Sequence, residues 1–280
     1  MQVKLRLLPT EQLHAHEETI PRNLKELIEE ITTDTVVKHP LIVEDKHFAI
    51  LDGMHRFAAL TNLGCNFIPV ALVDYSNPRI TVERWTRLID ATDRLHLLFE
   101  TLVPPLQIHN LNLREVGSES FAENLMDDHL AFSKLSMKER TYFVEGEPSN
   151  VLEAYELVRE LQEALEKADF KISIQTEAQS RKKLEADGKH CILTGPKIKK
   201  EDVLKIVSEN QVFPPKVTRH VLPLRVFNID VPLERLKSKE GIEAANHAFI
   251  EMLKLREQRI LPGGQEFEGR FYEEELIVFR

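Results

Sequence analysis

Apolar residues along the first hundred positions recur at two spacings, one typical of strands and one typical of helices. Runs of strand length lie at residues 3–8, 41–43, 48–51, 67–73 and 81–85. Apolar positions three or four residues apart predict a helix over about residues 22–31 and a second helix that ends at Gly64. Pro69 favours an edge strand or a strand start, because proline cannot donate to a ladder. The pattern predicts a compact α+β unit over residues 1–95.

The periodic spacing of apolar residues is weak in the middle of the chain and is clear again toward its end. Residues 96–150 keep no sustained period and contain Pro104-Pro105, so we expect a connecting or lid-like region there. Beyond it, Asn150 and Glu153 resemble a helix-capping pair. Predicted helices and strands then alternate over residues 152–165, 170–174, 178–186, 190–193, 202–208, 221–229, 242–256 and 276–279. This alternation predicts a second α/β domain over residues 96–280.

The predicted hairpin over residues 41–51 runs directly into the segment Ile50-Leu51-Asp52-Gly53-Met54-His55-Arg56 and then into a helix. A strand, a glycine turn and a helix start direct free backbone N–H groups and the positive end of the helix dipole at one point. Asp, His and Arg at that point favour an anion site or a metal–phosphate site. A capped helix whose Arg and His are merely solvated is the alternative at this stage.

Charge and cysteine content narrow the classes of partner. The chain has 280 residues and a net charge of −9, which makes nucleic acid an unlikely main partner. Cys65 and Cys191 lie far apart, which excludes a disulfide scaffold and a thiolate metal site and suits a reducing compartment. No apolar run is long enough to span a bilayer. We therefore expect a cytoplasmic protein that does not act at a membrane.

Three further segments carry polar groups that are candidates for chemistry. His16-Glu17 precedes the first helix, where an acid also simply favours the dipole. Trp85, the only tryptophan, is a substrate contact or ordinary core. Residues 217–220, Val-Thr-Arg-His, form a phosphate clamp or a solvated loop. Without a helical His-x-x-x-His pair a zinc site is not supported, whereas Mg²⁺ needs only one or two carboxylates beside phosphate oxygens. The glycine motifs of P-loops and dinucleotide folds are missing, so a nucleotide would be held by another device.

Four segments, in order, carry a resemblance to a known family. They are His16-Glu17, His39-Pro40-Leu41-Ile42-Val43, Ile50-Leu51-Asp52-Gly53-Met54-His55-Arg56 and Pro215-Lys216-Val217-Thr218-Arg219-His220-Val221-Leu222-Pro223, with Asn228-Ile229-Asp230-Val231-Pro232-Leu233 extending the last. Together they resemble the free L-serine kinases, of the SerK and SbnI types, within the ParB/sulfiredoxin-like superfamily. The Asp-Gly-x-His-Arg turn alone is typical of the whole superfamily. Together with the C-terminal Thr-Arg-His segment, it is specific to the kinases.

Two sister functions fit the turn less well. Sulfiredoxins place a cysteine between Gly and His, where this chain has Met54, so the thiol chemistry has no nucleophile. ParB proteins carry a Gly-Glu-Arg-Arg turn and a DNA-binding domain, whereas this chain has Gly53-Met54-His55-Arg56 and an acidic balance.

The resemblance implies a ParB/sulfiredoxin-like catalytic domain followed by a second α/β domain, with the active site in the cleft between them. The implied reaction transfers a phosphoryl group from ATP or ADP to the hydroxyl of L-serine, and O-phospho-L-serine would feed cysteine or siderophore biosynthesis. Glu17 would be the catalytic base, and Asp52 would hold Mg²⁺ or serve the transferring group. The implied phosphate-binding residues are Gly53, Met54, His55, Arg56, Thr218, Arg219 and His220. Trp85 and His16 would line the serine pocket.

A regulatory protein on the same fold is the alternative from another class. The SbnI type is known to combine kinase activity with haem-linked regulation of transcription, so the resemblance admits a haem-responsive protein. This chain keeps Glu17, Asp52, His55 and Arg56 and has no Cys-x-x-Cys-His signature, which favours the enzyme. The oligomeric state stays open.

Overall fold

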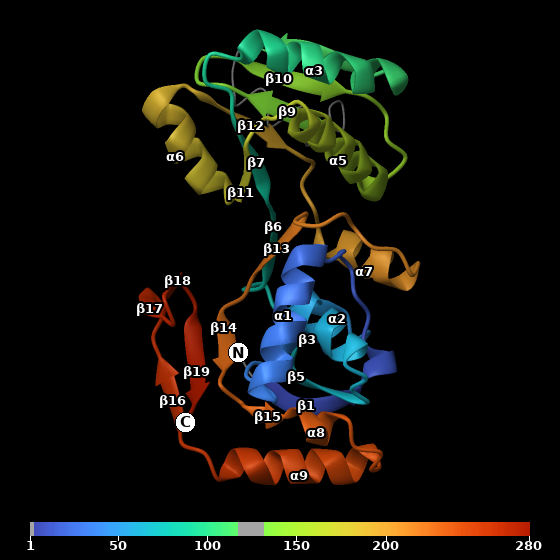
Figure 1. The fold of residues 1–280 in the computed structure, drawn as a ribbon, viewed down its shortest axis with the longest axis vertical. Helices are drawn as coiled ribbons and strands as arrows, with labels where there is room; N and C mark the ends of the chain where they lie inside the picture. Colours follow the sequence, from blue (N-terminus) through green and yellow to red (C-terminus); the bar gives the residue numbers. More distant parts are fainter. Residues whose placement is uncertain (1–2, 117–131) are drawn as a thin grey trace. The chain divides into compact units, whose positions relative to one another are not determined.

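The computed structural model describes residues 3–116 and 132–280, and the chain divides into two compact units (Figure 1). Unit 1 comprises Met1–Thr81, Val203–Pro215 and His220–Arg280, and unit 2 comprises Val82–Asp202 and Lys216–Arg219. This division differs from the predicted boundary at residue 95, because the last third of the chain returns to the N-terminal sheet. The mixture of helices and strands confirms the predicted α+β class.

Unit 1 is built on a four-stranded sheet in the order β1-β5-β3-β4. Its strands are β1 (Lys4–Pro9), β3 (Leu41–Glu44), β4 (Ile50–Asp52) and β5 (Phe67–Val73). The antiparallel pairing of β3 with β4 confirms the predicted hairpin. Helices α1 (Pro21–Asp34) and α2 (Met54–Asn62) pack against each other, and both confirm predicted helices.

The prediction that Pro69 marks an edge or a strand start is wrong. β5 lies between β1 and β3, antiparallel to the first and parallel to the second. Pro69 is opposite Leu7 of β1, and the ladder with β3 starts one residue later, at Val70 opposite Leu41. A residue without an N–H is tolerated there because the β3 ladder has not yet begun.

The C-terminal part of unit 1 completes the N-terminal sheet domain. Its elements are β14 (Leu224–Phe227), β15 (Val231–Pro232), α8 (Leu233–Leu236), α9 (Ile242–Lys254), β16 (Gln258–Leu261), β17 (Gln265–Phe267), β18 (Arg270–Tyr272) and β19 (Glu275–Phe279). β15 pairs with β2 (Val36–Val37), and the side-chain amide of Asn246 on α9 bonds both backbone groups of Leu7. β14 runs parallel to β19, whose other edge pairs with β16. The one-turn helix η1 (Thr10–Gln12) follows β1.

Unit 2 contains an antiparallel six-stranded sheet in the order β11-β7-β12-β9-β10-β8. The strands are β7 (Thr86–Asp90), β8 (Asn112–Val116), β9 (Ser133–Ser136), β10 (Thr141–Glu145), β11 (Ile172–Gln175) and β12 (His190–Thr194). Its helices are α3 (Leu95–Ile108), α5 (Val151–Lys167) and α6 (Glu177–Asp187). The Asn150 side chain accepts a hydrogen bond from the N–H of Glu153, which confirms the predicted cap of α5. β6 (Thr81–Arg84), α7 (Lys200–Ser208) and β13 (Thr218–Val221) begin in one unit and end in the other.

The stretch expected to be connecting or lid-like forms regular structure where it is described. α3, β8, β9 and β10 all fall within residues 96–150 or begin one residue before, and residues 117–131 lie outside the described part of the chain. Helix α3 is apolar on most sides, so its sequence lacks the alternation of apolar and polar faces that predicts a helix. It also contains Pro104 and Pro105, which are unusual inside a helix. Its Leu98, Leu102 and Leu106 are buried on one face.

Within the described residues, none of the helices combines the length and the apolar character that crossing a bilayer would require.

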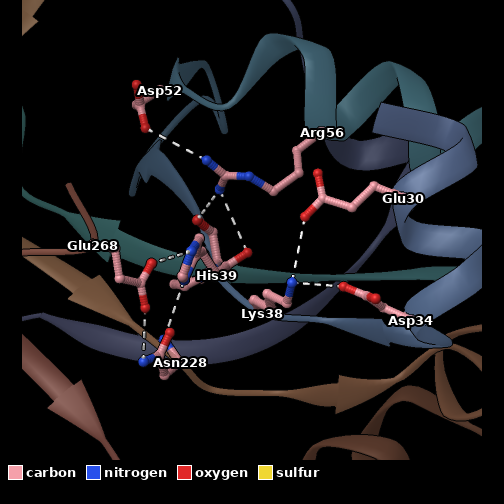
Figure 2. Close-up of polar contacts among 9 residues, drawn as sticks. Glu30, Asp34, Lys38, His39, Asp52, Arg56, Asn228 and Glu268 are labelled. Atoms are coloured by element: carbon pink, nitrogen blue, oxygen red, sulfur yellow. Dashed lines mark hydrogen bonds and ion pairs between the residues drawn. The ribbon is translucent and has the colours of Figure 1, made fainter. Parts of the chain in front are cut away.

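His39 joins the start of β3 to the segment that follows β14. Its Nδ1 accepts a hydrogen bond of 3.2 Å from the backbone N–H of Asn228 (Figure 2). The His39 ring also meets the ring of Phe227 edge-on. The Nε2 atom lies 3.8 Å from a carboxylate oxygen of Glu268. Burial, and next the nearby Arg56 charge, lower the pKa of His39 to about 4. The imidazole is therefore neutral at pH 7, as its role as an acceptor requires.

We expect His39 to make the protein more sensitive to acid. An unfolded histidine titrates near pH 6.5, so between that pH and about 4 the unfolded chain binds the extra proton. The stabilisation from neutral His39 is thus complete above pH 6.5 and is lost as the pH falls toward 4. In urea unfolding, His39→Gln should lose less free energy of unfolding between pH 7 and pH 5 than the parent chain, by about 1–2 kcal/mol. The exposed His14→Gln control should keep the parent pH dependence, and equal losses in all three proteins would contradict the prediction.

Candidate functional site

The turn before α2 requires glycine for two reasons. Gly53 has a φ of +103°, and a Cβ at this position would lie 3.1 Å from Cγ of Leu41 and 3.3 Å from Nη1 of Arg56. Gly53 is the N-cap of α2, and no side chain accepts a hydrogen bond from the first turn. The backbone N–H groups at the start of α2 therefore keep the donors and the positive dipole end that suit an oxyanion.

Asp52, the last residue of β4, lies beside two guanidinium groups. Its Oδ2 is 3.1 Å from Nη1 of Arg225 and 3.8 Å from Nη2 of Arg56 (Figure 2 draws the second pair). Burial alone would raise the pKa of Asp52, but the charges of Arg225 and then Arg56 outweigh it and lower the pKa below its usual value. Asp52 is consequently an ionised carboxylate whose side chain is still 39% exposed.

Arg225 is the main residue of this cluster that the sequence did not single out. It sits in β14 with only 14% of its side chain exposed, and its Nε donates to the carboxylate of Glu274. The only signal in the sequence was one cation inside the apolar run Leu224-Arg225-Val226-Phe227. Glu274 gave no signal, since it lies in a run of three glutamates.

Arg56 and His55, expected to bind phosphate, are both engaged with the backbone. Nη1 of Arg56 donates to the carbonyl oxygen of Pro40 and lies 3.4 Å from that of His39 (Figure 2). Nε2 of His55 accepts a 2.9 Å hydrogen bond from the N–H of Ile20, the N-cap residue of α1. These two side chains fix the start of β3 and the start of α1 relative to α2.

His16 and His220 form a buried pair against β4. Nδ1 of His16 is 2.7 Å from the carbonyl oxygen of Ile50, and the two rings meet edge-on with centroids 5.3 Å apart. Nε2 of His220 is 2.8 Å from the hydroxyl of Tyr75. Burial is the largest cause that lowers the pKa of both histidines, well below the usual value for His220. The two neutral imidazoles therefore act structurally: each holds its neighbour, the Ile50 carbonyl or the Tyr75 hydroxyl, by a hydrogen bond.

The loop that carries Glu17 is held from both sides by backbone hydrogen bonds. Phe213 donates its N–H to the carbonyl oxygen of His16 at 2.8 Å and accepts from the N–H of Glu18 at 2.9 Å. Glu17 lies between these two bonds, in a parallel bridge with Phe213. Its backbone position is therefore fixed, while its side chain is partly exposed.

Glu17 and the start of α2 line one cavity of about 420 Å³ in unit 1. The other lining residues come from the same loop and from a partly exposed face of α2: Ala15, Glu18, Thr19, Met54, Phe57 and Ala58. A carboxylate, a hydroxyl and the first residue of a helix thus border the same space. Glu18 and Thr19 were not among the residues predicted from the sequence.

The remaining predicted residues form a cluster within unit 2. Trp85 is half-buried, and the charged groups of Lys216 and Arg219 lie 6.0 and 5.9 Å from its ring centroid. Arg219 also pairs with the carboxylate of Glu83, and Thr218 is buried. Trp85 and Arg219 are thereby brought together with a lysine that carries a second positive charge.

The donor set for a metal ion is sparse. Among the residues that the structure describes, no group of three or more His, Cys, Asp or Glu side chains could hold a metal ion. An ionised, partly exposed Asp52 next to the start of α2 fits Mg²⁺ only as an ion whose other ligands are phosphate oxygens and water.

Comparisons with known proteins agree with this architecture, although no protein-family model matches the chain. The chain is 28% identical to a protein of Staphylothermus marinus named ATP-dependent L-serine kinase, over 82% of this chain and 90% of that protein. It is 24% identical to a protein of Thermococcus kodakarensis named ADP-dependent L-serine kinase SerK, over 81% of this chain and 90% of that protein.

Two solved structures share the fold. One is a free serine kinase in complex with AMP, with a TM-score of 0.69 and 23% identity, over 84% of this chain and 95% of that one. The other is SbnI from Staphylococcus aureus with a C-terminal truncation, with a TM-score of 0.71 and 18% identity, over 89% of this chain and 95% of that one. Sequence and fold agree, and the resemblance of this chain to the free serine kinase family is confirmed.

Proposed function

We propose that this protein is a free L-serine kinase that transfers the terminal phosphoryl group of ATP or ADP to the serine hydroxyl, giving O-phospho-L-serine. The observation that carries the proposal is the cavity of unit 1, because it places the carboxylate of Glu17 and the uncapped start of α2 beside one space. The named donors of the relatives, ATP for one and ADP for another, leave both nucleotides as candidates.

Glu17 is the proposed general base. A serine hydroxyl is a poor nucleophile, and a fixed carboxylate orients it and takes its proton as the bond to phosphorus forms. The backbone bonds to Phe213 on either side of Glu17 supply the rigidity that this role needs.

The start of α2 is the proposed phosphate cradle. Phosphoryl transfer depends mainly on alignment and charge neutralisation, and the backbone N–H groups of Gly53, Met54 and the following turn supply both. His55 and Arg56 support this cradle through their bonds to Ile20 and Pro40, so we assign them positioning roles in place of direct phosphate contact.

His16 and His220 are proposed to position β4 and the Glu17 loop. Both rings are buried and hydrogen-bonded, so we assign neither a serine contact nor a phosphate contact. Thr218 and Arg219 remain the proposed phosphate contacts, and Trp85 remains the proposed serine contact. Lys216, whose ammonium lies 6.0 Å from the Trp85 ring centroid, is added to the proposed serine contact.

Mg²⁺ is the proposed cofactor, bound with the nucleotide, and Asp52 is the carboxylate that this chain would offer it. When bound, Mg²⁺ would neutralise phosphate charge. Arg225 keeps Asp52 ionised and fixes its orientation. We also propose a cytoplasmic location, because Cys65 and Cys191 are both buried and unpaired.

The proposed activity is tested directly with the purified chain, L-serine, Mg²⁺ and either ATP or ADP. Phosphorus NMR and mass spectrometry should detect O-phospho-L-serine with at least one donor, and L-alanine should give no product because it lacks the hydroxyl. Absence of phosphoserine with both donors, in Mg²⁺ and in Mn²⁺, would exclude the proposed reaction.

Glu17→Gln should lower kcat by about 10²–10⁴-fold, because the amide keeps the shape of the side chain but cannot take a proton. Nucleotide affinity should change little, since the phosphate cradle is on α2. Glu11→Gln, on the exposed turn after β1, is the matched control and should behave as the parent. A Glu17→Gln kcat within threefold of the parent value would rule out the base.

Asp52→Asn should lower kcat by about tenfold or more and shift the Mg²⁺ dependence of the rate to higher concentration. The amide removes the negative charge, while Arg225 keeps its partner Glu274 and so preserves the fold. Asp45→Asn, in the exposed hairpin turn, provides the control. A parent-like Mg²⁺ dependence in Asp52→Asn would show that Asp52 is not a metal ligand.

A further inference from the structure

Strand β18 of unit 1 is anchored at both of its ends beside Asp52. Before the strand, a carboxylate oxygen of Glu268 lies 3.8 Å from Nε2 of His39 (Figure 2). After the strand, the carboxylate of Glu274 accepts a hydrogen bond from Nε of Arg225. Nη1 of the same arginine lies 3.1 Å from Oδ2 of Asp52. The residues between these two anchors are therefore held close to the carboxylate that precedes the start of α2.

The β17–β18 hairpin is fixed at its base by backbone contacts. Gly264 donates its N–H to the carbonyl oxygen of Tyr272 at 2.8 Å. A Cβ at Gly263 would collide with the carbonyl oxygen of Glu273, so glycine alone permits this close approach. Tyr272 is 8% exposed, and its ring meets that of Phe227 edge-on with centroids 5.3 Å apart. The hairpin is thus a well-fixed element, which is what a ligand-binding side chain requires of its support.

Arg270 lies on the same face of β18 as Tyr272. Residues two positions apart on a strand share a face, and the guanidinium carbon of Arg270 is 5.3 Å from the centroid of the Tyr272 ring. Phe271, between them, points to the other face and is 58% exposed. The ring of Tyr272 therefore holds the Arg270 guanidinium on the face that packs against unit 1.

Arg270 differs from the two other arginines near Asp52 in what it binds. Arg56 donates to a backbone carbonyl oxygen, and Arg225 donates to a carboxylate of its own sheet. Arg270 is exposed, and no residue in the described part of the chain forms a hydrogen bond or an ion pair with it. Burial raises the pKa of Asp52, and Arg270 is the third charge, after Arg225 and Arg56, that lowers it. The donors of Arg270 are thus close to Asp52 and available to a ligand.

We propose that Arg270 binds the phosphate groups of the nucleotide at the start of α2. Asp52 directly precedes Gly53, the N-cap of α2, so phosphate held by the backbone N–H groups there lies next to the carboxylate that Arg270 approaches. A planar guanidinium donates parallel hydrogen bonds to phosphate oxygens and neutralises part of their charge. The inference rests on the proposed kinase function and adds to it a phosphate contact from the C-terminal part of the chain.

Arg270→Gln tests the inference through nucleotide affinity, measured by isothermal titration calorimetry with ATP and with ADP in the presence of Mg²⁺. The dissociation constant should rise about tenfold or more, because charge-assisted hydrogen bonds to phosphate are lost. Arg270→Lys should lie between the variant and the parent, since the ammonium keeps the charge without the planar fork. In the phosphoserine assay, KM for the nucleotide should rise in Arg270→Gln, while KM for L-serine should stay within about twofold of the parent value, because the lost bonds are to the nucleotide.

Two variants serve as matched controls. Arg259→Gln removes an exposed arginine from β16, and Phe271→Ala alters the opposite face of β18, so both should keep the parent affinity. An Arg270→Gln dissociation constant within twofold of the parent value would overturn the inference, as would an equal loss in Arg259→Gln. If the parent binds nucleotide but yields no phosphoserine, the proposed reaction fails and the affinity comparison still decides the role of Arg270. Absence of binding to both nucleotides in the parent would overturn the two proposals together.

Discussion

The position of Asp52 between two guanidinium groups is the interaction on which the arrangement of unit 1 depends. Burial disfavours an ionised carboxylate, and here Arg225 and Arg56 reverse that preference. The three residues come from β14, α2 and β4, and Glu274 balances the second charge of the cluster. One ion-paired carboxylate thus ties the last third of the chain to the turn before α2. Removing Arg225 would take the nearest cation from two carboxylates at once, Asp52 and Glu274, whereas removing Asp52 leaves Arg225 paired with Glu274.

The histidines around this cluster contribute hydrogen bonds in place of charge. Burial lowers the pKa values of His16, His39 and His220, so near neutral pH these rings are neutral. The positive charge near α2 then comes from arginines, which do not titrate in the physiological range. In this cluster the arginines carry the charge, and the neutral histidines hold the backbone of β4, β3 and the Glu17 loop by hydrogen bonds. The electrostatic field at a phosphate-binding site built in this way does not change with pH in the physiological range.

Local features of the fold could be predicted from the sequence, and non-local ones could not. The turn at Asp52-Gly53 and the helix after it follow from the spacing of a few neighbouring residues, and both are present. Arg225 and Glu274 could not be placed, because an ion pair between strands distant in sequence leaves no period to detect. The family resemblance implied a phosphate contact for His220, whereas the fold buries this side chain against Tyr75 and His16. Helix α3 escaped notice because an apolar helix has no polar stripe.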